Sequence, residues 1–434
     1  MKKFLALILA LVMALSLVAC GGNSGAQGEG DGDAATGSVY YLNFKPEAEE
    51  AWQALAKTYT EQTGVPVKVV TAASGEYETM LVSEMDKDAA PTLFQCNEGG
   101  VATWGDFCYD LSDSAVYNEL ASKDYALKNA DGEVISIAYC LETYGIIVNK
   151  ALLEQAGHSL DEITDFDSLK AVADDIHARA DELGFDAFTS AGLDGSSSWR
   201  FSGHLSNMPL FYEFRDDGIS SKPATIKGTY LDNYKKVWDL YITDSATTGA
   251  ALLTATGDQA EAEFGEGKAV FYQNGTWEYS NLTETFGMNP DDLTMIPIYC
   301  GVEGEEKAGL CTGTENYWSV NKNAKEEDIK ATLDFLYWVV TSEEGTTMMA
   351  EQFGACPFNS SKAPSNPFSA LANEYVANGC YPVTWAFNYT PAVNDWRAAV
   401  VDALSKYTAG NGSWDDVKTA FVEGWATQYA NENA

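Results

Sequence analysis

The chain has 434 residues, enough for two packed domains, and 46% of them are hydrophobic, so intrinsic disorder is excluded for most of its length. Asp and Glu outnumber Lys and Arg by 64 to 26, which gives a formal charge of −38. A field of that sign repels phosphate backbones, so the composition argues against nucleic-acid binding.

The first twenty residues have the pattern of an export signal. Lys2 and Lys3 precede an uncharged stretch, 4–19, that is rich in Leu and Ala. This stretch is shorter than the roughly 20 residues of a membrane span and is typical of a signal peptide. It ends at Cys20 in a sequence that resembles a bacterial lipobox, so we expect cleavage before Cys20 and lipidation of its thiol. An ordinary secretory signal and a short membrane anchor are the alternatives.

Residues 21–37 contain mainly Gly, Ala, Asp and Glu and no large apolar side chain. Such a segment cannot bury enough surface to order itself, so we predict a flexible tether. A lipidated Cys20 would anchor the protein on the extracytoplasmic face of a membrane, at the cell surface or in a periplasm.

Seven further cysteines show no CxxC spacing, and the three histidines are far apart in the sequence. We therefore expect neither a metal site nor a cofactor. Cys300 and Cys311 flank a Gly-rich turn and form a candidate disulfide, with buried free thiols as the alternative.

The body opens with alternating strands and helices, in the order strand 39–42, helix 46–64, strand 65–70, helix 75–88 and strand 92–95. This alternation predicts a parallel sheet with crossover helices. Ligands bind at the carboxyl ends of the strands in such sheets. Lys45, Asn97 and Glu98 occupy those ends and are candidate ligand residues.

The rest of the chain continues this α/β pattern, with a strand region at 134–148 and apolar helical faces at 166–183, 229–242, 325–340 and 417–425. Trp52 and Trp238 lie on such faces and are expected in the core. A Gly/Ser-rich loop, 191–200, presents Trp199 and Arg200 as candidate ligand residues.

Signatures of catalysis are missing from the sequence. It has no GxxxxGK[ST] loop, no GxGxxG after a strand, no HExxH and no GxSxG. Carboxylates are plentiful, so a glycosidase with two catalytic carboxylates stays open. The 11 Trp and 23 Tyr favour sugar recognition, because the C–H faces of a pyranose pack on aromatic rings.

Residues 263–278, EFGEGKAVFYQNGTWE, contain the most specific motif. A turn at 267–268 precedes a strand that begins at Ala269, so Trp277 emerges just beyond the end of that strand, where a ligand can reach it.

This motif is similar to a run in family 1 extracellular solute-binding proteins of ABC importers, through Phe264, Gly267, Lys268, Ala269, Gly275 and Trp277. Residues 139–150, YCLETYGIIVNK, resemble the family's strand that crosses between lobes and ends in Tyr-Asn-Lys, with Asn149 and Lys150 matching and Val148 in place of the Tyr. Glu142 stands where that family commonly has an acidic hydroxyl acceptor. Residues 317–354 resemble its late strand and helix.

The resemblance implies a two-lobed α/β fold of the type II periplasmic-binding-protein kind, with a parallel-type sheet in each lobe and a ligand cleft between the lobes. The implied segments are 38–140 plus 320–354 for the N-terminal lobe, 146–310 plus 360–434 for the C-terminal lobe, and hinge strands near 141–145, 311–319 and 355–359. The family often adds a stacking Trp late in the chain, which makes Trp385, Trp396 and Arg397 candidates.

The implied function is capture of a neutral oligosaccharide by hinge closure, without catalysis. The expected partners are the membrane subunits of an ABC permease with their ATPase, and we expect a monomer. The alternatives are a solute-binding protein for a peptide or polyamine, a secreted glycoside-acting enzyme and a surface adhesin. The complete set of candidate ligand residues is Lys45, Asn97, Glu98, Glu142, Trp199, Arg200, Trp277, Trp385, Trp396 and Arg397.

Overall fold

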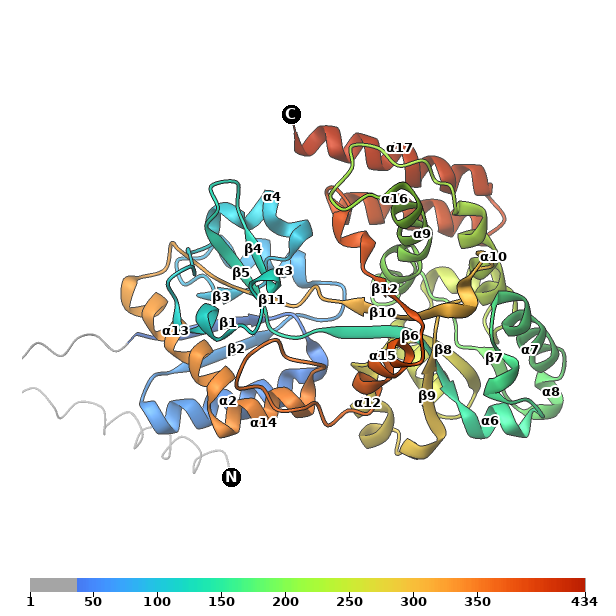
Figure 1. The fold of residues 1–434 in the computed structure, drawn as a ribbon, viewed down its shortest axis with the longest axis horizontal. Coiled ribbons are helices and arrows are strands. Elements are labelled where there is room, and N and C mark those ends of the chain that lie inside the picture. The colour runs from blue at the N-terminus through green and yellow to red at the C-terminus, as the bar shows by residue number, and fades with distance from the viewer. Residues whose placement is uncertain (1–36, 434) are drawn as a thin grey trace, which may run out of the picture. The chain divides into compact units, whose positions relative to one another are not determined.

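The computed structural model describes residues 37–433, which fold around two mixed β-sheets (Figure 1). The predicted signal peptide, Cys20 and nearly all of the predicted tether lie outside the described residues. Within residues 37–433, no helix is long and apolar enough to cross a membrane.

The first sheet has the strand order β2-β1-β3-β11-β5-β4. Its strands are β1 (Val39–Asn43), β2 (Val67–Thr71), β3 (Leu93–Phe94), β4 (Ala126–Lys128), β5 (Val134–Ala138) and β11 (Tyr317–Val320). β1 is parallel to β2 and β3, which confirms the parallel pairing predicted for the first segments. β11 returns from far along the chain and is antiparallel to both β3 and β5, so the sheet is mixed.

Helices α2 (Glu49–Thr63), α13 (Glu326–Thr341) and α14 (Glu343–Gln352) pack together against the first sheet (Figure 1). Shorter helices complete this part: α3 (Tyr77–Met85), α4 (Val101–Trp104) and α5 (Ala115–Glu119). The core prediction for Trp52 is confirmed, because its ring is fully buried edge-on to Tyr41 at 5.1 Å and Trp318 at 6.1 Å. α2 ends at Gly64, whose φ of 76° suits a residue without a Cβ.

The second sheet has the order β12-β10-β6-β8-β7, and β9 also pairs with β6. Its strands are β6 (Glu142–Asn149), β7 (Asp186–Phe188), β8 (Ala269–Gly275), β9 (Leu293–Ile296), β10 (Ala308–Gly313) and β12 (Tyr381–Thr384). The prediction of a parallel-type sheet is wrong here. Among the described strands of this second sheet, only β7 with β8 and β10 with β12 are parallel, because the long central strand β6 takes antiparallel neighbours on both edges.

The helices around the second sheet bury two core clusters, one of them the largest in the described residues. They are α6 (Lys150–Gln155), α7 (Phe166–Ala178), α8 (Ala180–Leu183), α9 (Asn207–Asp217), α10 (Leu231–Thr243), α11 (Gly257–Gly265), α12 (Glu278–Ser280), α15 (Phe368–Ala377), α16 (Val393–Thr408) and α17 (Trp414–Glu432). The core prediction for Trp238 is confirmed, and α16 and α17 form a packed pair (Figure 1).

The predicted strand 134–148 is two strands that belong to different sheets. β5 ends at Ala138, and Leu141 then bridges to Ala355 before β6 begins. The chain passes between the sheets at 139–141, again at 314–316 and again at 353–367. The lobe and hinge boundaries given above stay a prediction.

The candidate disulfide is not formed. Cys300 and Cys311 are both free thiols, and the sulfur of Cys311 lies 3.7 Å from that of Met208. Cys311 belongs to β10, and both cysteines are buried in the same apolar core cluster.

Trp396→Ala is expected to destabilise the fold by about 3–5 kcal/mol. The side chain is 1% exposed, its ring packs edge-on to Phe421 at 4.7 Å, and its indole N–H donates to the Phe421 carbonyl at 2.9 Å. Urea unfolding followed by circular dichroism measures the change. Val376→Ala, at a position on α15 that is 48% exposed, is the control and should stay within about 0.5 kcal/mol. An unchanged midpoint for Trp396→Ala would contradict its place in the core.

Candidate functional site

A buried ion pair joins the end of β1 in the first sheet to the start of β6 in the second. The Lys45 Nζ lies 2.6 Å from the Glu142 Oε1, and these side chains are only 5% and 7% exposed. The Asn316 amide donates to the other carboxylate oxygen of Glu142 at 2.6 Å. Two predicted site residues are therefore in direct contact, and Asn316 is one that the sequence did not indicate.

Local sequence explains the position of Lys45. The Asn43 side chain accepts a hydrogen bond from the Lys45 backbone N–H at 3.1 Å and donates to its carbonyl at 2.7 Å, and Pro46 then begins a short 3-10 turn. Burial alone would lower the pKa of Lys45. The carboxylates of Glu142 and Glu47, the latter 3.0 Å away, outweigh burial and raise that pKa above its ordinary value.

A second carboxylate, Glu98, meets the neighbouring strand β11. The Tyr317 hydroxyl donates to the Glu98 Oε1 at 2.7 Å. Burial, with a further contribution from Glu315, raises the pKa of Glu98 to about 7. The adjacent Asn97 uses its side-chain oxygen to cap the turn at Gly100, at 3.1 Å.

Aromatic rings gather beside Lys45. The Lys45 Nζ lies 5.6 Å from the Trp277 ring centroid, and the Trp199 ring centroid lies 6.0 Å from that of Trp277. His204, which the sequence did not indicate, lies 5.4 Å from Trp277. A Cβ on Gly275 would come within 2.2 Å of the Trp277 ring, so the ring rests directly on the strand backbone. This contact explains why the motif has a glycine two residues before the tryptophan.

Of the three candidates near the C-terminal end of the chain, Trp385 and Arg397 lie with the residues described above and Trp396 lies in the core. Trp385 is buried 5.7 Å from His204, and the Arg397 guanidinium lies 3.4 Å from Glu315. Trp396 faces away, into the core between α16 and α17, because consecutive helical side chains point about 100° apart. We therefore leave Trp396 out of the candidate site.

Arg200 is buried in the protein rather than exposed on an open loop. It is 2% exposed and begins a π-helical turn, Arg200–Leu205. Its guanidinium donates to the Ser190 carbonyl at 3.0 Å and to the Ser197 hydroxyl at 2.8 Å. The indole of Trp199 donates to the Ser196 carbonyl at 2.8 Å, which fixes the ring at the start of this turn.

Of the 17 buried side-chain polar atoms that lack a hydrogen-bond partner within residues 37–433, six belong to these residues. They are Glu98 Oε2, Arg200 Nε, His204 Nδ1, Asn316 Oδ1, Trp385 Nε1 and Arg397 Nε, and the remaining atoms lie on other residues, such as Trp52 and Tyr241 in the core. Each such atom costs about 1–3 kcal/mol unless something pairs with it. Unpaired polar atoms beside aromatic rings are features that a ligand with many hydroxyl groups can use.

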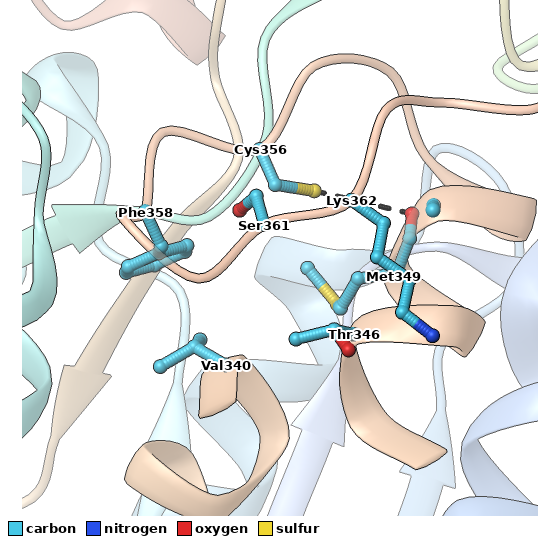
Figure 2. Close-up of a pocket in the computed structure, with 8 residues that line it drawn as sticks. Val340, Thr346, Met349, Cys356, Phe358, Ser361 and Lys362 are labelled. Carbon is cyan, nitrogen blue, oxygen red and sulfur yellow. Dashed lines mark hydrogen bonds between the residues drawn. The ribbon is translucent and has the colours of Figure 1, made fainter. Parts of the chain in front are cut away.

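Two cavities lie away from the residues described above. One, of about 10 Å³, has room for about one water and is lined by Met349, Cys356 and Phe358 with their neighbours (Figure 2). The other is open and lies at the acidic loop 301–306. There the Glu305 carboxylate accepts hydrogen bonds from backbone N–H groups, including that of Phe166 at 2.7 Å. Within residues 37–433, no cluster of His, Cys, Asp and Glu is arranged to hold a metal ion.

The family model for bacterial extracellular solute-binding proteins matches residues 54–375, which is most of the chain. The chain belongs to this family. The match includes β6, β8 and the motif that contains Trp277, which are segments that carry the resemblance to solute-binding proteins. Family members are binding proteins that act outside the cytoplasm.

Solved structures of such proteins match almost the whole chain. RafE of Streptococcus pneumoniae in complex with raffinose is 18% identical, with a TM-score of 0.68 over 88% of this chain and 98% of its own. A sugar transporter from Bacillus licheniformis in complex with stachyose is 17% identical, at 0.68 over 90% and 100%. A chitin oligosaccharide binding protein is 16% identical, at 0.69 over 91% and 99%. These matches confirm the predicted two-lobed fold.

Glu142→Leu is expected to destabilise the protein by about 3–5 kcal/mol, because it leaves the buried Lys45 ammonium without its main partner. The double variant Lys45→Met/Glu142→Leu should recover most of that loss, since neither charge is then buried alone. Urea unfolding of the two single variants and the double variant measures the coupling. Asp334→Ala, which breaks an exposed pair with Lys330, should change stability by less than about 1 kcal/mol. Additive single effects would contradict the buried pair.

Glu98→Gln is expected to alter how stability depends on pH. The folded-state pKa of about 7 lies above the ordinary value of 4.5, so this carboxyl lowers the stability of the wild type as pH rises between those values. Glutamine can still accept from Tyr317 but does not titrate. The difference in Tm between Glu98→Gln and wild type should therefore grow from about pH 5 to about pH 8. Glu182→Gln, on the exposed surface of α8, is the control, and a difference that is constant with pH would contradict the assignment.

Proposed function

We propose that this protein captures a neutral oligosaccharide for an ABC importer. The observation that carries the proposal is the group of aromatic rings at Trp199, Trp277 and Trp385 beside the buried pair of Lys45 and Glu142. Rings of this kind pack on the apolar faces of pyranoses, while carboxylates and amides hydrogen-bond their hydroxyls. Asn97, Glu98, Arg200 and Arg397 complete the proposed site, as direct contacts or as supports.

Structural neighbours support a sugar as the ligand. Two solved neighbours are described in complex with raffinose and with stachyose, and another as a chitin oligosaccharide binding protein. A further one, the GacH receptor of Streptomyces glaucescens, was solved without ligand and with acarbose. All of these are oligosaccharides or their mimics, so the aromatic group of this chain is proposed to serve the same ligand class.

The proposed mechanism is binding and release without catalysis. The chain passes between its two sheets at three points, so hinge bending there would let a sugar enter and then enclose it. The closed, liganded form would dock as a monomer on the membrane subunits of a permease, whose ATPase drives transport. A lipid on Cys20 and the segment 21–37 would hold the protein at the extracytoplasmic face of the membrane.

Trp277→Ala is expected to weaken sugar binding by about 1–3 kcal/mol, because a desolvated aromatic platform is lost. The measurement is calorimetric titration of residues 38–434 with raffinose, stachyose, acarbose and a chitin oligosaccharide, and with a polyamine and a peptide for the alternative ligands.

Trp338→Ala is the matched control, since Trp338 is a partly buried tryptophan on α13 that packs against Tyr59. Its affinity for sugar should equal that of the wild type. Binding of the polyamine or peptide but of no sugar would overturn the proposed ligand class, and release of reducing ends from the sugars would overturn the absence of catalysis. Equal affinities for Trp277→Ala and wild type would remove Trp277 from the site.

A further inference from the structure

The π-helical turn Arg200–Leu205 places His204 at the centre of the aromatic group. Turns of this kind are rare and occur frequently at functional sites, because they widen the helix and redirect side chains. The sequence around His204 contains no motif that indicated a function for this residue. In the structure the side chain is 4% exposed and lies among rings from three other segments and the ring of Trp199, just before the turn.

The imidazole of His204 is held in one orientation by its neighbours. It stacks on the Tyr144 ring, with centroids 4.0 Å apart and planes 12° apart, and Trp199 meets it edge-on at 5.1 Å. Trp277 and Trp385 lie 5.4 and 5.7 Å away. The Tyr144 hydroxyl donates to the His204 carbonyl at 3.2 Å, so the backbone is fixed as well as the ring.

The polar atoms of this imidazole are not used by the protein. Its Nδ1 is buried and has no hydrogen-bond partner within residues 37–433. Burial, followed by the positive charges of Arg397, Lys45 and Arg200, lowers the pKa of His204 well below its ordinary value. A neutral imidazole offers one donor and one acceptor, which matches a sugar hydroxyl, itself both donor and acceptor.

A glycine positions a charged neighbour of this turn. A Cβ on Gly203 would come within 2.7 Å of the Arg397 guanidinium, so Arg397 lies directly against the turn that carries His204. This contact keeps a cation beside the imidazole and disfavours its protonation. The turn, the rings and the cation thus act together on one side chain.

We propose that His204 hydrogen-bonds a hydroxyl group of the bound sugar from inside the aromatic group and contributes to the selectivity of the site. This inference rests on the proposed function, since it assigns a contact within the same site. A site built to hydrogen-bond a hydroxyl discriminates strongly against ligands that lack it, because its own polar atom is then left unpaired.

His204→Phe keeps a planar ring for stacking and removes both nitrogens. Calorimetric titration with raffinose and stachyose should show affinity reduced by roughly 5- to 100-fold for the sugar that the wild type binds. His177→Phe is the matched control, because His177 lies on α7 in contact with Asp186, and its affinity should not change. Thermal unfolding of each variant shows whether it is folded before titration.

A second measurement uses the unaltered protein, whose three histidines give a simple spectrum. Nitrogen-15 NMR of labelled histidine should show the signal of one neutral imidazole shifting when raffinose or stachyose is added, while those of His158 and His177 stay constant. If the wild type binds neither these sugars nor the others in the panel, the proposed function fails. If it binds a sugar while the His204 signal and the affinity of His204→Phe are unchanged, the inference about His204 is overturned and the proposed function stands.

Discussion

The buried contact between Lys45 and Glu142 is the constraint around which the proposed site is built. Each charge loses several kcal/mol of hydration on burial, so neither could remain there without the other. The contact fixes the end of β1 against the start of β6, and Asn316, just before β11, satisfies the second carboxylate oxygen. Three chain segments that are distant in sequence therefore meet at one carboxylate, and the aromatic rings are arranged around that point.

Glycines determine where the large side chains of the site lie. The Trp277 ring rests on Gly275, the Trp385 ring comes equally close to Gly313, and the Arg397 guanidinium lies on Gly203. A Cβ at Gly275 or Gly313 would come within 2.4 Å of the indole, which no packed pair of atoms allows. The strand ends thus form flat surfaces for rings, and the backbone itself shapes the site.

Electrostatics at the site differ from those of the whole chain. The formal charge is −38, yet Lys45, Arg200 and Arg397 are all close enough to His204 to lower its pKa. Salt screens the distant carboxylates within about 8 Å, so burial and then the local cations favour the neutral imidazole. Burial raises the pKa of Glu98 at the same time, which brings two titratable groups toward their neutral forms. Neutral hydrogen-bonding groups between aromatic rings suit an uncharged ligand with many hydroxyls.

Periodicity and local motifs indicated several of the helices, the first three parallel strands and the place of Trp277 just beyond β8, because these depend on nearby residues. Lys45 was found as a candidate by its place at a strand end and Glu142 by the family resemblance, but their contact joins residues 97 positions apart. Only the tertiary structure decided that β11 enters the first sheet antiparallel, that 134–148 is divided between two sheets, and that Trp396 is buried while Arg397 reaches the site. Asn316 and His204 had no sequence signal. Their roles come from rings and charges that long-range folding brings beside them, and such pairings leave no local pattern in the sequence.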